Sequence, residues 1–217
     1  ETYRPKPESA VHTFCHALPN TWHQMGVILS ATDALNWFSS LVETPVEEIM
    51  EALEGSIPHP SKAIFLPYLS GERTPHNDSQ IRGGFVGLDH NQGKVDLIKS
   101  ILEGIAFALK DNLGALADAG TKPNKLLAVG GGVQSNYWLS VLSTILNLKI
   151  DVPKSMQLGA AFGAARLAMA AATTLTFKEI FVKPQIRETV QPLIEKTEIY
   201  EKSYDRYRKI YPALKGI

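Results

Sequence analysis

Residues Leu127–Trp138 read LAVGGGVQSNYW: an apolar run leads into three consecutive glycines, and an amphipathic helix begins after them. Around this stretch the sequence predicts a strand over 125–129, a helix over about 135–147, a strand over 149–152 and a helix over about 158–173. Strands that alternate with helices in this way are typical of sheets joined by helical crossovers. The stretch therefore predicts an α/β fold, of which this segment forms half a sheet.

The glycine triplet, Gly130–Gly132, has two interpretations. A tight turn from strand to helix needs only one glycine, because glycine adopts positive φ at no steric cost. Three glycines suggest in addition a ligand that lies flat against bare main chain, with the amides at the start of the following helix donating to its polar atoms. We therefore expect a ligand site at this turn.

A dinucleotide site is one alternative, because Gly130–Ser135 nearly matches the pattern G-x-G-x-x-G. Asp151 stands about 20 residues further on, where an NAD-binding protein keeps the carboxylate that binds the ribose. Ser135 replaces the third glycine, however, and only one more strand is predicted after it. A phosphate-binding P-loop is excluded, because the Gly-Lys pair at 93–94 is followed by valine instead of serine or threonine.

The N-terminal part of the chain predicts a β-hairpin and then two helices. The runs 11–17 and 21–29 flank a Pro-Asn turn and are expected to be its strands. Ser30 opens a pattern similar to a capping box before the first helix. Thr44 is the expected cap of the second helix, with a proline at its first position.

The middle of the chain combines an apolar run with a long polar segment. Residues 63–69 suit an edge strand because they contain a proline, and 70–88 are expected to form a loop. Within that loop Glu72 and Arg73 are expected to be solvated or bridged locally. Residues 94–118 repeat apolar side chains with the period of a long core-facing helix.

The C-terminal segment 195–214 predicts a helix with four tyrosines on one stripe. Packing on the core is the expected role of this stripe, and an oligomer contact is the alternative. The helix predicted over about 158–173 is rich in glycine and alanine, with Gly159 and Gly163 four residues apart. Small residues at this spacing indicate close packing against a sheet or another helix.

Composition limits the partners of the chain. Its 217 residues contain 22 Lys and Arg and 22 Asp and Glu without long runs of one sign, so neither a nucleic-acid surface nor a membrane surface is expected. Cys15 is the single cysteine, which indicates a reducing compartment, by default the cytoplasm. His12 and His16 would lie roughly 13 Å apart on a strand, too far apart to share one metal ion.

Several segments resemble one enzyme family. The run 83–88, GGFVGL, followed after seven residues by 96–104, DLIKSILEG, is similar to the second signature of the FGGY family of carbohydrate kinases. FLPYLSGERTPHND at 65–78, GGGVQSNYW and GAAFGAARLA add to this resemblance, which covers 11–172 and points, within the family, to the kinases of D-xylulose. A kinase of another ketose or polyol, an NAD-binding oxidoreductase fragment and a nucleotide-binding module without chemistry stay open.

The resemblance implies a mixed sheet flanked by helices, in a ribonuclease H-like (actin-like ATPase) lobe. Residues 1–180 would be the C-terminal nucleotide-binding lobe of the kinase, and 181–217 a tail with a packing helix. The N-terminal lobe, with the catalytic base and most sugar contacts, would lie outside this sequence. The fragment alone is therefore expected to be inactive, and a homodimer of the enzyme stays open.

The resemblance also implies the ligands of the chain and the residues that bind them. The ligands would be a small sugar and ATP with Mg²⁺, and no catalytic or metal-binding residue is expected within this chain. The family's adenosine turn corresponds to 131–133 with an asparagine at the helix start, and a second strip of contacts corresponds to the first helix. The expected nucleotide-binding residues are Thr32, Asn36, Gly131, Gly132, Val133 and Asn136.

Overall fold

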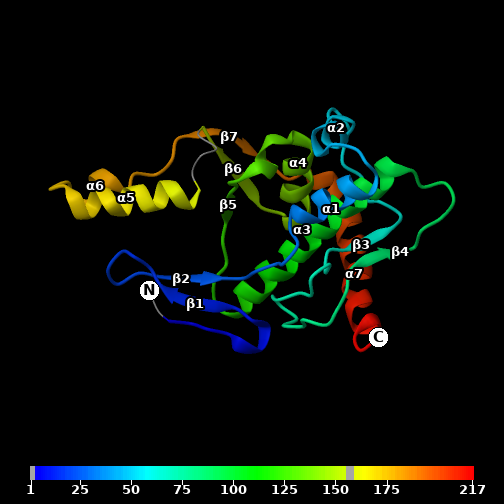
Figure 1. Ribbon diagram of the computed structural model, residues 1–217, viewed down its shortest axis with the longest axis horizontal. Helices are drawn as coiled ribbons and strands as arrows, with labels where there is room; N and C mark the ends of the chain where they lie inside the picture. The colour runs from blue at the N-terminus through cyan, green and yellow to red at the C-terminus, as the bar shows by residue number, and fades with distance from the viewer. Residues whose placement is uncertain (1–2, 155–158) are drawn as a thin grey trace.

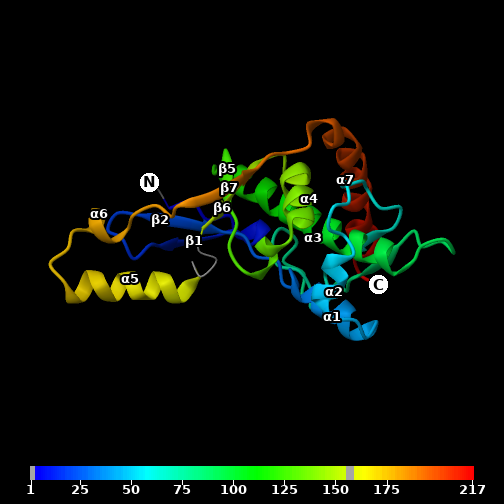
Figure 2. The same cartoon turned by 90° about the horizontal axis from the view of Figure 1, so that it is seen from above.

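A computed structural model describes residues 3–154 and 159–217 of the chain. Figures 1 and 2 show a body of helices around a short two-stranded sheet, with a three-stranded sheet beside it. A β-hairpin and a helical arm both extend from the side of that second sheet, away from the body. The mixed α/β composition agrees with the predicted fold class.

The predicted hairpin is confirmed. Strands β1 (His12–Cys15) and β2 (Trp22–Met25) pair antiparallel after a short 3-10 helix, η1 (Pro7–Ser9). The turn between them contains Asn20 at a φ of 54°, a conformation that asparagine tolerates better than most residues.

The two predicted helices are present, but both predicted caps are wrong. Helix α1 (Asp33–Leu41) has Thr32 as its N-cap, and Ser30 contributes only its carbonyl, which accepts the Ala34 amide at 2.8 Å. Helix α2 (Val46–Glu51) begins after Pro45, which stands at the cap position that the sequence assigned to Thr44. Neither cap residue makes a side-chain hydrogen bond to its helix, so packing of the buried faces has to hold these short helices.

The segment 70–88 is not entirely a loop, because it contains strand β4 (Gly84–Val86). β4 pairs antiparallel with β3 (Ile64–Leu66), which is fully buried and, among the described residues, has β4 as its one partner, as expected of an edge strand before a proline. Phe65 and Phe85 face each other across the pair with ring centroids 4.7 Å apart. This aromatic contact lies in the main core of the chain.

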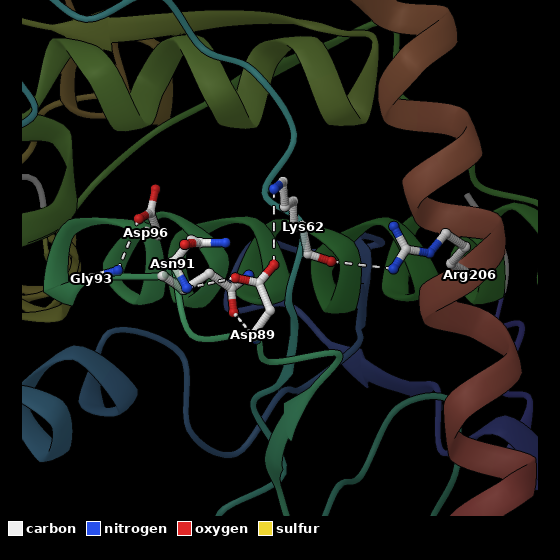
Figure 3. Close-up of polar contacts among 7 residues, drawn as sticks. Lys62, Asp89, Asn91, Gly93, Asp96 and Arg206 are labelled. Atoms are coloured by element: carbon white, nitrogen blue, oxygen red, sulfur yellow. Dashed lines mark hydrogen bonds and ion pairs between the residues drawn. The ribbon is translucent and has the colours of Figure 1, made fainter.

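Helix α3 (Lys94–Asp118) has the predicted bounds and crosses the body as its central element. At its start the Gly93 amide donates to the Asp96 carboxylate at 3.0 Å, while Lys62 and Asp89 form an ion pair at 3.8 Å beside it (Figure 3). Lys94 donates to Thr44 at 2.8 Å. The Gly-Lys pair is thus occupied by internal contacts, which agrees with the exclusion of a P-loop.

The second sheet follows the order β5 (Lys125–Leu127), β6 (Lys149–Pro153), β7 (Ile186–Val190). β5 and β6 are parallel, as the alternation predicts, and helix α4 (Asn136–Leu146) connects them after the 3-10 turn η2 (Gly131–Gln134). The third strand, β7, was not predicted from the sequence, and it runs antiparallel to β6. The sheet is therefore mixed.

Helix α7 (Ile194–Leu214) packs along the body, as the tyrosine stripe predicts (Figure 1). Tyr200 and Tyr207 are 1% exposed, and the Tyr207 and Tyr68 hydroxyls are hydrogen-bonded at 2.7 Å. The expected close packing of helix α5 (Ala160–Ala172) is not found within the described chain. None of its residues is buried, and its main contact is with the short α6 (Phe177–Ile180).

Candidate functional site

Each glycine of the triplet has a different structural role. Gly130 has a φ of 98°, which favours glycine, so it makes the turn out of β5. A β-carbon on Gly132 would come within 3.0 Å of Cε3 of Trp138, so this glycine makes room for the indole ring. A β-carbon on Gly131 would meet no atom within 4 Å. Gly131 is therefore open main chain of the kind that a flat ligand needs, and so is Gly130, where a β-carbon would likewise meet no atom within 4 Å.

Ser135 connects the glycine turn to the helix after it. Its hydroxyl accepts the Trp138 amide at 3.2 Å, which makes Ser135 the N-cap of α4. The same hydroxyl donates to Oε1 of Glu54 at 3.1 Å. The start of α4 is thus linked to the turn after α2, which lies 81 positions earlier in the sequence.

A cavity of about 740 Å³ lies between the glycine turn and the helices α1 and α2. This volume is in the usual range for small-molecule sites. Four of the expected nucleotide-binding residues line it together: Thr32, Asn36, Gly131 and Gly132. The structure thus brings both predicted strips, which lie about 100 positions apart in sequence, to one hollow.

The other two expected residues do not line this cavity. Val133 is 3% exposed and packs with Ile150 and Val152 beneath the turn, so its side chain supports the sheet. Asn136 is exposed at the first position of α4, next to Ser135. Asn36 does line the cavity, and its amide donates to the Asp33 carboxylate at 3.4 Å.

Sequence reasoning missed the acidic side of the cavity. Glu47, Glu51 and Glu54 line it from α2 and from the turn that follows α2. Three carboxylates repel an anion more strongly the closer it comes. A ligand that carries phosphates would therefore bind with its phosphate groups away from α2. Glu47 lies in the first turn of α2, where acidic residues are common, whereas Glu51 ends the helix and Glu54 follows it, and no sequence signal distinguished the three from ordinary surface charges.

Glu72 was expected to be solvated or locally bridged, but it is 2% exposed. Its Oε1 accepts the Arg73 amide at 2.7 Å and the Leu29 amide at 3.2 Å. Burial raises the pKa of its carboxyl to about 7, against the opposing effect of these two hydrogen bonds. Nearby, the Thr74 hydroxyl donates to the Ala10 carbonyl at 3.0 Å. The SGERTPH segment therefore holds the hairpin region to the body.

Asp151, the carboxylate that an NAD site would need, is already hydrogen-bonded within the protein. It is 7% exposed, and it accepts from Lys125 at 2.6 Å and from Thr189 at 2.7 Å. These contacts hold its pKa below the ordinary value. With both carboxylate oxygens engaged across the sheet, Asp151 serves as a link between strands and is not free to bind a ribose.

Comparison with known proteins identifies the family. The profile of the FGGY family of carbohydrate kinases, C-terminal domain, matches residues 1–172. The chain belongs to the FGGY family. This membership and the occupied Asp151 together show that the alternative of an NAD-binding oxidoreductase is wrong.

FGGY relatives match the chain along almost its full length. It is 38% identical to the xylulose kinase of Escherichia coli over 216 residues, which is 99% of this chain and 45% of that protein. A crystal structure of a xyloylose kinase from Brucella ovis, 51% identical, superposes with a TM-score of 0.92 over 98% of this chain and 45% of that one. The xylulose kinase of Lactobacillus acidophilus, 26% identical, gives a TM-score of 0.80 over 98% of this chain and 44% of that one.

These FGGY neighbours confirm the predicted fold class, a lobe of the actin-like ATPase type. The chain spans slightly less than half the length of the relatives it matches. No helix among the described residues is long and apolar enough to cross a membrane. The same part of the chain contains no group of three or more His, Cys, Asp or Glu side chains that could hold a metal ion.

Proposed function

We propose that this chain is the nucleotide-binding half of an ATP-dependent sugar kinase that converts D-xylulose to D-xylulose 5-phosphate. The observation that carries the proposal is the cavity in which Thr32 and Asn36 meet Gly131 and Gly132. The two relatives named xylulose kinase and the xyloylose kinase support the choice of sugar. A kinase of another ketose or polyol is the alternative within the family.

In this proposal the cavity receives the adenosine part of ATP. The open main chain at Gly131 lies against the flat face of the nucleoside, and Asn36 and Asn136 supply polar contacts to it. Thr32 approaches the ribose through its backbone at the start of α1. Val133 acts from below by packing the turn against the sheet.

Phosphoryl transfer requires the sugar hydroxyl, the γ-phosphoryl group and the leaving ADP to be held in line. The part of this task proposed for the chain is to bind and orient the ADP end. The carboxylates of α2 contribute by directing the phosphates away from themselves, toward the other end of the cavity. The aspartate that takes the proton from the sugar hydroxyl is proposed to come from the N-terminal lobe, and lobe closure to exclude water.

Mg²⁺ usually binds proteins through one or two carboxylates together with substrate phosphates. In this proposal no residue of the chain is assigned to Mg²⁺. When bound to the phosphates, the ion would neutralise their charge. The domain boundary at residue 180, the cytoplasmic location, the homodimer and the inactivity of the fragment alone stay predictions.

Two measurements test the proposed function. Calorimetric titration of the chain with ATP, ADP and NAD should give binding of the adenine nucleotides, and binding of NAD alone would contradict the proposal. The second measurement uses the full-length protein and follows ADP release with D-xylulose, other ketoses and polyols. Turnover with D-xylulose is expected to be fastest. Nucleotide binding without turnover on any sugar would favour a binding module without chemistry.

A further inference from the structure

One hydrogen bond joins the two sides of the cavity. Ser135 belongs to the glycine-turn side, and its hydroxyl donates to Glu54 on the α2 side. Ser135 is 7% exposed, whereas Glu54 is exposed, so water is kept from the donor of this contact but reaches the other side of the carboxylate. Hydrogen bonds to a charged acceptor are also stronger than those between neutral groups. The contact is therefore suited to fix the distance between the two sides.

Glu54 also determines how Ser135 works as a cap. A serine hydroxyl has one hydrogen and two lone pairs. When the hydrogen points to Glu54, the lone pairs are free to accept the Trp138 amide, which lies at 3.2 Å. Without Glu54 the hydroxyl can rotate and donate elsewhere, and the cap is then weaker. Glu54 thus stabilises the start of α4 although it belongs to another element.

The start of α4 in turn supports the glycine turn. Trp138, whose amide is held by the cap, is the residue whose indole ring lies against Gly132. A shift of Trp138 would therefore move the main chain at Gly132, next to the open surface of Gly131. The contacts form one chain from Glu54 through Ser135 and Trp138 to the wall of the cavity.

We propose that Glu54 is a positioning residue of the nucleotide site, an inference that rests on the proposed function. It acts through Ser135 on the shape of the glycine turn and so on the affinity for the adenosine part of the nucleotide. The charge of Glu54 lowers the affinity for the phosphates, because a carboxylate in the cavity repels them. The positioning effect and the charge effect can therefore be separated by ligands with and without phosphates.

The experiment compares adenosine with ATP by calorimetric titration of the 217-residue chain. Glu54→Ala should weaken binding of adenosine by about five- to tenfold, which corresponds to about 1 to 1.4 kcal/mol, the net contribution of one partly exposed hydrogen bond. Binding of ATP should weaken less, because phosphate repulsion is relieved at the same time. Glu54→Gln should bind adenosine within about twofold of the wild type, because its amide oxygen accepts the same hydroxyl.

Two further variants complete the design. Glu48→Ala removes the same charge from α2 at an exposed position outside the cavity lining, and it should leave both affinities unchanged. Ser135→Gly removes the hydroxyl but keeps a residue that is well tolerated at an N-cap. It should lose as much adenosine affinity as Glu54→Ala, and adding Glu54→Ala to it should cause no further loss. This variant also carries the test if Glu54→Ala does not fold.

The results separate two kinds of failure. If the wild-type chain binds neither adenosine nor ATP, the proposed function fails and the inference fails with it. If the wild-type chain binds them but Glu54→Ala binds adenosine equally well, the positioning role is overturned and the proposed function stands. A loss in Glu54→Gln as large as in Glu54→Ala would also overturn it, because the hydrogen bond would then not be the cause.

Discussion

The indole ring of Trp138 lies directly against the main chain of Gly132, at a distance that leaves no space for a β-carbon. A β-carbon there would come within 3.0 Å of Cε3 and closer still to Cζ3. The neighbouring Gly131 has no atom within 4 Å of the corresponding position. Two adjacent glycines thus have opposite requirements, since one is needed by the fold and the other is free to serve a ligand.

This pair gives a matched test of the glycine turn. Gly132→Ala should destabilise the chain by about 1 to 3 kcal/mol, the usual cost of overpacking, and should weaken ATP binding as the turn shifts. Gly131→Ala should leave the unfolding midpoint nearly unchanged but still weaken ATP, because its methyl group covers the open main chain. Urea unfolding and calorimetric titration measure both effects. Equal destabilisation by the two substitutions would contradict the assigned roles.

Asn136 can be tested in the full-length enzyme because it is exposed at the start of α4, beside the cavity. Asn136→Ala should raise the KM for ATP by about three- to tenfold, as expected when one hydrogen bond to the substrate is lost. The KM for the sugar should stay nearly unchanged. Asn124→Ala, at an exposed asparagine just before β5, is the control. An equal rise of both KM values would count against a contact with the nucleotide.

The sequence predicted those elements whose signal is local. The apolar period over 94–118 gave both ends of α3 correctly, and the strand–glycine–helix pattern located β5 and α4. Two strands were not predicted from the sequence: β4, which is only three residues long, and β7, which pairs with a strand more than 30 positions earlier. Strands of this kind depend on distant partners, and a period within a short window cannot show them.

The same distinction applies to the site. The glycine turn was visible in the sequence because consecutive glycines are unusual, and the resemblance then related it to α1. Glu54 and Trp138 were not found, because their roles come from contacts with Ser135 and Gly132 that only the fold creates. For Glu72 the adjacent opposite charge suggested solvent, whereas the fold buries its carboxylate and brings the Leu29 amide, 43 positions away, to it beside the Arg73 amide.

Glu103 should make the stability of the chain depend on pH. It is 3% exposed, accepts the Ser61 amide at 2.9 and 3.1 Å, and has a pKa that burial raises from 4.5 to about 8. Between these values the folded state holds a proton that the unfolded state has lost. Its contribution to stability is therefore complete below pH 4.5 and is lost as the pH rises to 8.

Glu103→Gln should remove this dependence, since the amide is neutral at every pH. The free energy of unfolding, measured in urea at pH 5, 6.5 and 8, should fall with pH more steeply in the wild type than in the variant. The difference should reach a few kcal/mol at most, because one pKa unit corresponds to about 1.4 kcal/mol. Comparison of the two curves cancels the contributions of Glu72 and His76, whose pKa values are also shifted. Parallel curves would show that Glu103 is ionised in the folded state.

Tyr207 tests whether the tyrosine stripe of α7 serves the core. It is 1% exposed, and its hydroxyl contacts that of Tyr68, which lies 3.1 Å from Nε2 of His76 as well. Tyr207→Phe should cost only about 1 kcal/mol, because Tyr68 keeps this second partner. Tyr207→Ala leaves a cavity and should cost about 3 to 5 kcal/mol. Lys209→Ala, at an exposed position of the same helix, should cost almost nothing.

Urea unfolding gives these free energies, and analytical ultracentrifugation gives the oligomeric state of the same samples. If Tyr207 belongs to the core, the loss of stability in Tyr207→Ala should not depend on protein concentration, and the sedimentation of the folded chain should match the wild type. If Tyr207 instead forms an oligomer contact, the substitution should change the oligomeric state and leave the stability of the monomer nearly unchanged. Tyr207→Ala would then unfold at nearly the wild-type urea concentration in dilute solution and would sediment as a smaller species. The burial of Tyr207 against Tyr68 and Phe107 within one chain favours the first outcome.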